Sequence, residues 1–167
     1  MKQLIAVLTT ALLLLAASGL VLAAPMADSN GMISKKSAYS VKETIDRLEA
    51  VLKKKGITIV TRWSHSDRAK AVNIPLRPTE LLLFGNPKLG SNMFTSKQTA
   101  GIDLPMKALA WEDENGQVWL TYNDPAYIAK RHGITDRAKV VAKMTAALDK
   151  FSTLATQPSA PSAPNLK

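Results

Sequence analysis

Residues 106–122, MKALAWEDENGQVWLTY, carry the clearest structural signal in the chain. Apolar and polar side chains alternate over 106–111 and again over 118–122, on either side of Asn115-Gly116. Successive side chains of a strand point to opposite faces, and Asn-Gly readily adopts the positive φ angles of a tight hairpin turn. The pattern therefore predicts a hairpin of two antiparallel strands.

Helix and strand patterns flank this hairpin. Ser40–Glu43 is a capping box, and the apolar residues after it recur on one helical face until Gly56, which can take a left-handed stop. β-branched residues predict a strand over 57–63. The run 80–84, which is continuously apolar after Glu80, predicts a strand that is covered on both faces. A first strand is expected around 33–39.

Further helix starts are marked by a capping side chain or by proline at the first helical position. Ser64 or Ser66 can cap a helix that ends before Pro75, and Asn86-Pro87 starts another. Asp124-Pro125 starts a third helix, with Gly133 as its stop, and Thr135 caps the last one. Adjacent strands flanked by helices predict an α+β fold, in which an antiparallel sheet carries its helices on one face.

The N-terminal segment has the pattern of a secretory signal. Lys2 precedes an apolar run that starts at Leu4, and Val21-Leu22-Ala23 matches a small-residue cleavage site, so cleavage after Ala23 is expected. The alternative is a retained membrane anchor, since the apolar stretch approaches the ~20 residues that span a bilayer. We therefore expect a signal peptide over 1–23, a flexible segment over 24–33, one domain over 34–154, and a disordered Pro/Ser/Ala-rich tail over 155–167 of a periplasmic or secreted protein.

Composition narrows the classes of partner. The chain has 167 residues, a formal net charge of +9 and no cysteine, which excludes disulfides, thiolate metal sites and CxxC redox chemistry. In an exported protein this charge favours anionic lipid headgroups, cell-wall polymers or acidic partners over nucleic acid. A small molecule or an envelope protein is the expected partner, and a homodimer is left open. No stable membrane span is expected once the signal is removed.

The stretch 81–105 raises the question of a nucleotide site, because Gly85 and Gly90 have the spacing of the first half of a phosphate-binding loop. Such a loop needs Lys and then Ser or Thr after the second glycine, whereas Ser91-Asn92 follows here. This difference excludes the nucleotide loop. The glycines are interpreted as a tight turn, with an anion site at the following helix start as the alternative.

Polar and aromatic residues near the expected strand ends form the candidate site. Histidine is the usual acid, base or metal ligand at neutral pH, and His65 lies just after a strand, beside Asp67. His132 is assigned to a helix C-terminus, where positive charge is favourable. A pocket between sheet and helices is the usual place for a ligand. The predicted ligand-binding residues are His65, Asn86, Asp103, Trp111, Tyr122 and Asp124.

Three longer stretches contain these motifs: SAYSVKETIDRLEAVLKKKGITIVTRWSHSDRAKAV, LLLFGNPKLGS and TAGIDLPMKALAWEDENGQVWLTYNDPAYIAKRHGI. Together they resemble the family called domain of unknown function 302, over about residues 34–153. The resemblance implies the order β-α-β-β-β-β-α in a TATA-binding-protein-like arrangement, a shape from which nucleic-acid binding does not follow. It implies no established catalytic activity, and the cofactor stays unknown. The family's recurring elements fall on His65, 84–87, 101–105, Trp111-Glu112 and 122–125.

These observations favour an exported, non-catalytic module that binds a small ligand or a partner segment in a cleft near His65, Asn86, Asp103 and Tyr122. One alternative is an enzyme of unassigned class, in which His65 is a general base positioned by Asp67 or Asp103. The other is an envelope metal-handling protein that uses His65, Asp103 and either Met93 or Met106. No metal site is assigned, since the sequence has no HxxxH or HxH pair, and no GxSxG motif marks a nucleophile.

Overall fold

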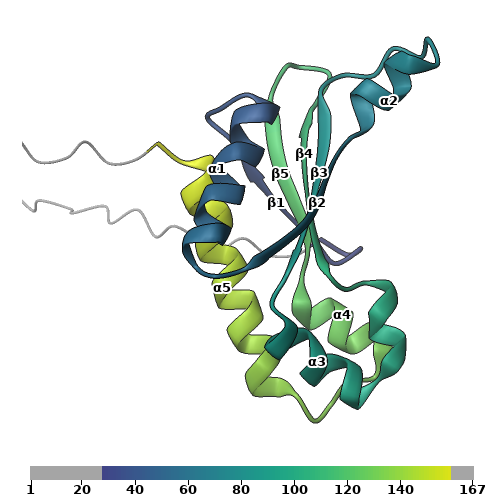
Figure 1. Cartoon of the computed structure of the whole chain (residues 1–167), viewed down its shortest axis with the longest axis vertical. Coiled ribbons are helices and arrows are strands. Elements are labelled where there is room, and N and C mark those ends of the chain that lie inside the picture. Colours follow the sequence, from purple (N-terminus) through teal and green to yellow (C-terminus); the bar gives the residue numbers. More distant parts are fainter. Residues whose placement is uncertain (1–27, 159–167) are drawn as a thin grey trace, which may run out of the picture.

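The computed structural model describes residues 28–158, in which five strands form one antiparallel sheet (Figure 1). The strands lie in the spatial order β1-β5-β4-β3-β2. Their bounds are β1 Met32–Lys36, β2 Thr58–Ser64, β3 Thr79–Gly85, β4 Met106–Glu112 and β5 Val118–Asn123. The predicted signal peptide, residues 1–23, lies outside the described residues.

Two long helices cover one face of this sheet. These are α1, Val41–Lys54, and α5, Ala138–Thr156, which pack against each other (Figure 1). Three shorter helices lie between strands: α2 His65–Ala71, α3 Pro87–Ser96 and the 3-10 helix η1 Gln98–Ile102. A fourth, α4 Pro125–His132, joins β5 to α5. The predicted α+β fold, an antiparallel sheet with its main helices on one face, is confirmed. No helix within residues 28–158 is long and apolar enough to cross a membrane.

The β4–β5 hairpin forms as the alternation predicts. Trp111 pairs with Trp119 across the ladder, and Gly116 has a φ of 77° in the connecting loop. The Asp113 carboxylate closes this loop by accepting hydrogen bonds from the backbone N–H groups of Asn115 and Gln117, each at 2.9 Å. The Trp119 indole also donates to it at 2.9 Å. These bonds, that of Trp119 first, lower the pKa of Asp113 and fix the hairpin register.

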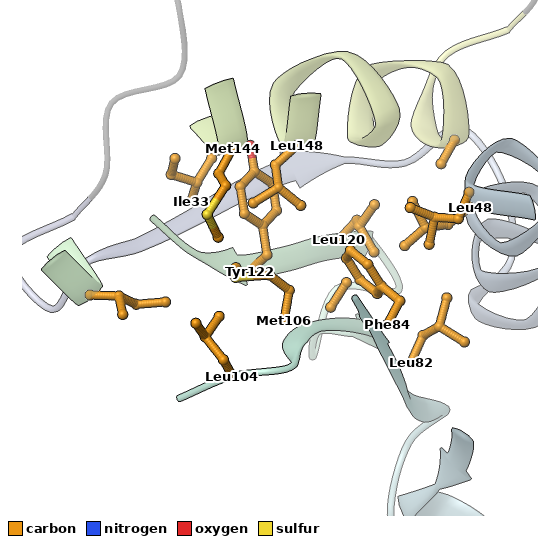
Figure 2. Close-up of a cluster of buried hydrophobic side chains, with 14 of the residues drawn as sticks. Ile33, Leu48, Leu82, Phe84, Leu104, Met106, Leu120, Tyr122, Met144 and Leu148 are labelled. Carbon is orange, nitrogen blue, oxygen red and sulfur yellow. The ribbon is translucent and has the colours of Figure 1, made fainter. Parts of the chain in front are cut away.

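The core lies between the sheet and the two long helices (Figure 2). The apolar stripe of α1 places Ile45, Leu48 and Leu52 against the sheet, where each is buried. Leu82 and Leu120 are buried on the helix-facing side of β3 and β5. Each fully buried aliphatic side chain contributes about 1.5–3 kcal/mol, so this layer is the main source of stability.

The other face of the sheet has no helix over it. Leu82 and Phe84 of β3 are buried against the helices, whereas Leu81 and Leu83 point to the open face and are partly exposed. The prediction that this strand is covered on both faces is therefore wrong. Its apolar run has another cause: Leu81 lies between Leu109 and Trp63 of the neighbouring strands, and such cross-strand contacts stabilise a sheet without a second layer.

The last helix begins later than its capping signal indicates. Gly133 adopts the left-handed conformation that ends α4, as predicted, and Ile134 then returns to the core, where it is buried. This detour keeps Thr135 out of the helix, so α5 starts at Ala138 behind Arg137, which provides no side-chain cap. The prediction that Thr135 caps the last helix is wrong because packing of Ile134 overrides the local signal.

Both ends of the ordered fold extend beyond the predicted domain limits. Residues 24–33 are expected to be flexible, but Met32 and Ile33 belong to β1. They are ordered because β1 pairs with β5 along its whole length. At the other end, α5 continues to Thr156, and both Ala155 and Thr156 are buried. Residues 155 and 156, which are predicted to belong to the tail, therefore belong to α5.

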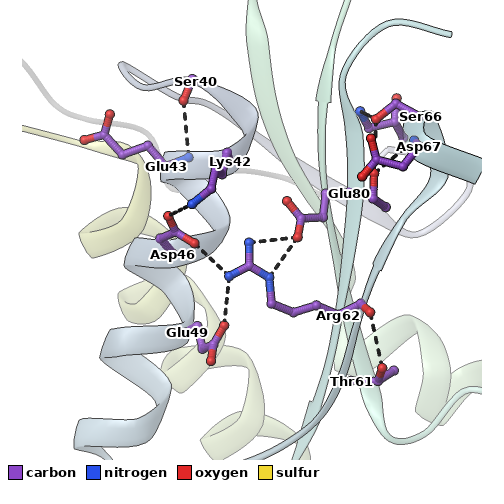
Figure 3. A network of polar contacts seen from close by, with 12 residues as sticks. Ser40, Lys42, Glu43, Asp46, Glu49, Thr61, Arg62, Ser66, Asp67 and Glu80 are labelled. Atoms are coloured by element: carbon purple, nitrogen blue, oxygen red, sulfur yellow. Dashed lines mark hydrogen bonds and ion pairs between the residues drawn. The ribbon is translucent and has the colours of Figure 1, made fainter. Parts of the chain in front are cut away.

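An ion-pair network ties α1 to the outer strands (Figure 3). Arg62 of β2 contacts Asp46 at 2.7 Å and Glu49 at 3.1 Å, both on α1, and its Nε and Nη2 donate to Glu80 of β3 at 2.8 Å. Together the three carboxylates raise the pKa of Arg62, with the Glu80 hydrogen bond as the largest cause. Arg62 therefore acts as a charged bridge between helix and sheet.

Candidate functional site

One end of the sheet holds four of the six predicted site residues. Because neighbouring strands run in opposite directions, the ends of β3 and β5 lie beside the start of β4. At this end of the sheet, Asn86 follows β3, Asp103 precedes β4, and Tyr122 and Asp124 lie at the end of β5. His65 and Trp111 lie toward the other end, where β2 and β4 finish. The structure therefore does not bring all six residues into one cleft.

His65 is separated from Asp103, one of the two carboxylates that are expected to position it, whereas Asp67 lies on the same helix. It is the first residue of α2, is exposed, and its ring makes no hydrogen bond or ion pair among residues 28–158. Asp103 lies beyond the opposite end of the sheet and binds a different imidazole, that of His132. His65 follows the end of β2, which lies near the last residues of β4, whereas Asp103 comes just before the first residue of β4. This arrangement contradicts the pairing of His65 with Asp103.

The residue set considered for a metal ion is also dispersed. Met93 and Met106 are buried in the core, and His65 and Asp103 lie at opposite ends of the sheet. Within the part of the chain that the structure describes, no group of three or more His, Asp or Glu side chains could hold a metal ion. The metal-handling alternative has no assembled ligand set among these residues.

Asp103 and His132 form a compact polar cluster under the connections at this end. The Asp103 Oδ2 lies 2.7 Å from His132 Nε2, and its Oδ1 accepts a hydrogen bond from Arg131 at 3.1 Å. The other ring nitrogen of His132, Nδ1, lies 3.0 Å from the exposed Thr99 hydroxyl. The Asp103 and His132 side chains are only 10% and 8% exposed. The cluster therefore ties η1 to the end of α4 from the inside.

A hydroxyl, an imidazole and a carboxylate in series can in principle move a proton from Thr99 to His132. The cavity described below includes Leu104 and Pro105 in its wall, but not Asp103 or His132. The contacts thus support a structural tie between two connections. His132 does end a helix, as the sequence indicates, but its bond to Asp103 could not be read from spacing, because the two residues lie in separate elements.

Tyr122 belongs to the core. Its ring points away from the sheet toward α5 and lies between Met144 and Leu148 (Figure 2). Its hydroxyl has no hydrogen-bond partner among the described residues. Burial raises the pKa of Tyr122, and the nearby Ser152 hydroxyl acts in the opposite direction. Tyr122 therefore packs the sheet against α5 and does not face a solvent-filled cleft.

Trp111 and Asp124 have local structural roles. Trp111 stacks on Trp119 on the open face, with ring centroids 6.5 Å apart, and its indole donates to the Thr121 hydroxyl at 2.9 Å. Asp124 caps α4 by accepting a hydrogen bond from the backbone N–H of Ala126 at 3.0 Å. These contacts account for both residues without a ligand.

A cavity of about 200 Å³ opens at the same end of the sheet, between α3, α5 and the starts of β2 and β4. Its wall is almost entirely apolar. The residues that form it include Leu52, Ile57, Val60, Phe84, Leu89, Phe94, Leu104, Pro105, Met106, Met144, Ala147, Leu148 and Phe151. Thr58 and Pro87 are exposed at its edge, so the space communicates with solvent. This apolar cavity, and not a polar cleft, is the candidate ligand site at this end of the sheet.

Three residues of the 81–105 stretch border this cavity: Gly85, Asn86 and Gly90. Neither glycine has a positive φ angle, since Gly85 ends β3 and Gly90 lies inside α3. The prediction of a tight turn that requires these glycines is therefore wrong. A Cβ at Gly85 would lie 3.4 Å from Pro105, and one at Gly90 would lie 3.5 Å from the Phe94 ring. Their small size helps to keep the space open.

Asn86 supplies the polar edge of the cavity. Its Oδ1 caps α3 by accepting hydrogen bonds from the backbone N–H groups of Lys88 at 2.9 Å and Leu89 at 3.4 Å. This cap fixes the orientation of the amide, because Oδ1 must face the helix and Nδ2 must point away from it. Nδ2 donates no hydrogen bond to another described residue.

Sequence reasoning missed the apolar side chains of this wall as a site. Met144, Leu148 and Phe151 follow a helical period, and that pattern predicts a core stripe. Periodicity gives the face of a helix but not how completely the opposite surface fills the space. The small residues Gly85 and Gly90 are the one local signal that the packing here is incomplete.

Comparisons with known proteins agree with this fold. The family model described as "Domain of unknown function DUF302" matches residues 33–151. A crystal structure of an uncharacterized conserved DUF302 protein from Bacillus stearothermophilus is similar, with a TM-score of 0.68 and 18% identity. The similarity covers 75% of this chain and 98% of that one. At this identity the likeness shows the fold alone.

Curated relatives share part of the sequence. The chain is 47% identical over 112 residues to proteins named fluoride-specific ion channel FluC 1 from Brucella suis and Brucella abortus. The match covers 66% of this chain, but only 44% and 42% of those relatives. The chain thus matches less than half the length of each. With most of its described residues matched by the family model, the chain belongs to the DUF302 family.

Proposed function

We propose that this protein is an exported, non-catalytic module that binds a small apolar molecule in the cavity between α3, α5 and the sheet. The observation that carries the proposal is the apolar space of about 200 Å³. Protein interiors are normally close-packed, so a space of this size needs an explanation. An engineered apolar cavity of about 150 Å³ binds benzene. This cavity therefore matches a molecule about as large as a substituted benzene ring.

The polar edge of the cavity narrows the class of ligand. The free Nδ2 of Asn86 is a hydrogen-bond donor, and nearly all the other wall residues are apolar. A pocket of this kind takes a largely apolar molecule and orients it through a single polar contact. The expected ligand has a compact apolar body and one hydrogen-bond acceptor, such as a carbonyl or carboxylate oxygen.

Export rests on the sequence pattern of residues 1–23. If the signal is cleaved as proposed, mass spectrometry of protein recovered from the envelope fraction or the culture fluid will find an N-terminus at Ala24. A protein that retains Met1 and sediments with membranes would instead support the anchor alternative.

Ligand binding can be tested with residues 24–167, which contain every described element. Thermal unfolding should be measured with benzoate, phenol, indole and hexanoate as probes. A ligand at a hundredfold excess over its Kd stabilises the folded state by about 2.7 kcal/mol, which raises Tm by several degrees in a domain of this size.

Ala147→Leu provides the specific test. Ala147 lines the cavity, so three additional carbons would fill part of it and remove the ligand-induced rise in Tm. At ~0.8 kcal/mol for each buried carbon, less about 1 kcal/mol of lost rotamer freedom, the variant itself gains about 1–1.5 kcal/mol. Ala146→Leu is the matched control, because Ala146 is the exposed neighbour on the same helix. A probe that still stabilises Ala147→Leu binds elsewhere, and the absence of any stabilising probe refutes the proposal.

A second candidate function is an accessory role beside an ion channel. It is favoured by the 47% identity to proteins named as fluoride-specific channels, of which the matched segment makes up less than half. Fluoride efflux from vesicles would be compared for the Brucella suis relative, for a form without the matched segment, and for a chimera that carries residues 33–151 of this chain. Equal efflux without the matched segment would remove the basis for this role.

A further inference from the structure

Residues 65–78, here called the α2 arm, project from the end of the sheet beside β2 and β3 (Figure 1). The arm consists of α2 and the loop that leads to β3. None of the residues of α2 is buried. A helix of seven residues gains little stability by itself, so its retention without core packing calls for another explanation.

The loop of the arm carries the largest group of exposed aliphatic side chains that are close together in sequence. Val72 is 64% exposed, Ile74 is 59% exposed and Leu76 is 48% exposed. Single exposed apolar residues are common on protein surfaces, but several on one projecting segment mark a contact site. The apolar tip is thus available to a partner and is not used by the core.

An aromatic side chain lies at the base of the arm. Trp63, near the end of β2, is 44% exposed, and the Arg68 guanidinium lies 4.4 Å from the centroid of its ring. Tryptophan is enriched at membrane–water interfaces, where its apolar ring and its indole N–H meet both environments. Trp63 therefore adds an exposed amphipathic side chain at the base of the arm, next to Arg68.

The charge of the arm is positive. Arg68, Lys70 and Arg77 outnumber its single acid, Asp67, and none of these three cations forms an ion pair within the described residues. Arg77 donates a hydrogen bond to the backbone oxygen of Glu112 and otherwise stays exposed. Exposed aliphatic side chains flanked by cations are the combination that binds anionic lipid surfaces.

Charge also decides between a lipid surface and a second copy of the chain. A second copy would carry the same positive charge, +9 for the full chain and +8 without Lys2, and would repel the arm at long range. The carboxylates Asp46, Glu49 and Glu80 are already bound to Arg62. The Asp113 carboxylate, which lies near Arg77, accepts hydrogen bonds within its own hairpin. An anionic bilayer attracts the cations of the arm and can bury its aliphatic tip. It is therefore a better partner for the arm than a second copy of the chain.

We propose that the α2 arm is a contact site for an anionic lipid surface, with Val72, Ile74 and Leu76 entering the interface and with Arg68 and Lys70 at the headgroups. Trp63, at the base of the arm, contacts the same surface. The inference is independent of the cavity, which lies at the other end of the sheet.

Vesicle co-sedimentation with residues 24–167 tests the proposal without the apolar N-terminal segment. Vesicles of phosphatidylcholine with 30 mol% phosphatidylglycerol are compared with pure phosphatidylcholine. Binding is expected only to the anionic vesicles and should weaken in high salt, because screening shortens electrostatic attraction. The variant Arg68→Gln/Lys70→Gln should lose about fivefold in partition coefficient for each cation, the equivalent of ~1 kcal/mol per charge. Lys54→Gln/Lys55→Gln, two exposed cations before the start of β2, is the matched control and should bind as the parent does.

The aliphatic tip is tested by Val72→Ser/Ile74→Ser/Leu76→Ser, which should lose binding more than tenfold without a change in Tm, since no residue of the tip is buried. Ile102→Ser is its control, because Ile102 is also exposed but lies on η1.

Direct contact is read from fluorescence. The chain has three tryptophans, so Trp111→Phe/Trp119→Phe leaves Trp63 alone, and its emission should shift to the blue on anionic vesicles. Equal binding to neutral vesicles, unchanged binding of the arm variants, or a Trp63 emission that does not respond would each overturn the proposal. A vesicle-independent dimer that the tip variant abolishes would assign the arm to a second copy instead.

Discussion

Replacement of Arg62 by methionine tests how the ion-pair network contributes to stability. Methionine keeps most of the apolar stem of arginine and removes the charge. After the change, Asp46 keeps its partner Lys42 and Glu49 keeps Lys53. Glu80, whose side chain is 16% exposed, loses its only cation among the described residues. The effect of the substitution should therefore come mainly from Glu80.

The expected loss follows from these contacts. A largely buried carboxylate without a partner costs about 2 kcal/mol, within the range measured when one group of a hydrogen-bonded pair is removed. The bonds to Asp46 and Glu49 add about 0.5 kcal/mol each, because each of these carboxylates keeps a lysine partner after the change. We expect Arg62→Met to lower the free energy of unfolding by about 3 kcal/mol and Tm by about 10 °C.

Urea and thermal unfolding at pH 7 measure this loss, and two variants test its origin. Lys42→Met removes a cation that also contacts Asp46 but is 79% exposed, so it should cost less than about 0.5 kcal/mol. Arg62→Met/Glu80→Leu removes the stranded carboxylate as well and should recover most of the loss. If the double variant is no more stable than Arg62→Met, the cost does not arise from Glu80 and the reasoning fails.

At acidic pH, the difference in the free energy of unfolding between the parent and Arg62→Met should become smaller. Hydrogen bonds from Lys42 and then Arg62 lower the pKa of Asp46, and those from Lys53 and Arg62 lower the pKa of Glu49. A lowered pKa gives stability that is present above the ordinary values of 3.8 and 4.5 and is lost as pH falls through the folded-state pKa. The difference should be constant from pH 7 to pH 5 and shrink below pH 4.5. A difference that grows in acid would contradict this sign.

Two further substitutions address the predicted site residues. Tyr122→Phe removes a buried hydroxyl that has no partner, so stability should stay within about 1 kcal/mol of the parent or rise; a loss above 2 kcal/mol in urea unfolding would reveal an unrecognised hydrogen bond. His132→Leu strands the buried Asp103 with only the exposed Arg131, which should cost about 2 kcal/mol, whereas Thr99→Val should cost less than about 1 kcal/mol in the same assay. Equal losses would mean that the exposed Thr99 contact contributes as much as the buried pair.

Local sequence patterns predict the hairpin and the helix starts of this protein because interactions between neighbouring residues form them. The alternation around Asn115-Gly116 predicts the β4–β5 hairpin, and proline after Asp124 predicts the start of α4. The capping serine at Ser40 does accept a hydrogen bond from the backbone N–H of Glu43. Each signal acts within a few residues, so no knowledge of the rest of the fold is needed.

Prediction fails where distant packing decides. Thr135 has a good capping side chain, but Ile134 is drawn into the core and delays the helix. Leu81 and Leu83 belong to a continuous apolar run, and only the absence of a second layer shows that they face outward. The pairing of Asp103 with His132 depends on how two connections meet, which no spacing rule contains.

The candidate site was misplaced for a related reason. Rules for active sites select polar side chains at strand ends, and this fold uses such side chains for its own connections. Asn86 and Asp124 satisfy the N–H groups of helix starts, while Asp103 holds η1 to α4. The two surfaces that have no structural partner in the described residues are apolar. They are the cavity beside α3 and α5 and the tip of the α2 arm. Sequence patterns assign such residues to the core, so only their exposure and incomplete packing in the structure indicate that they are available to a ligand or a lipid surface.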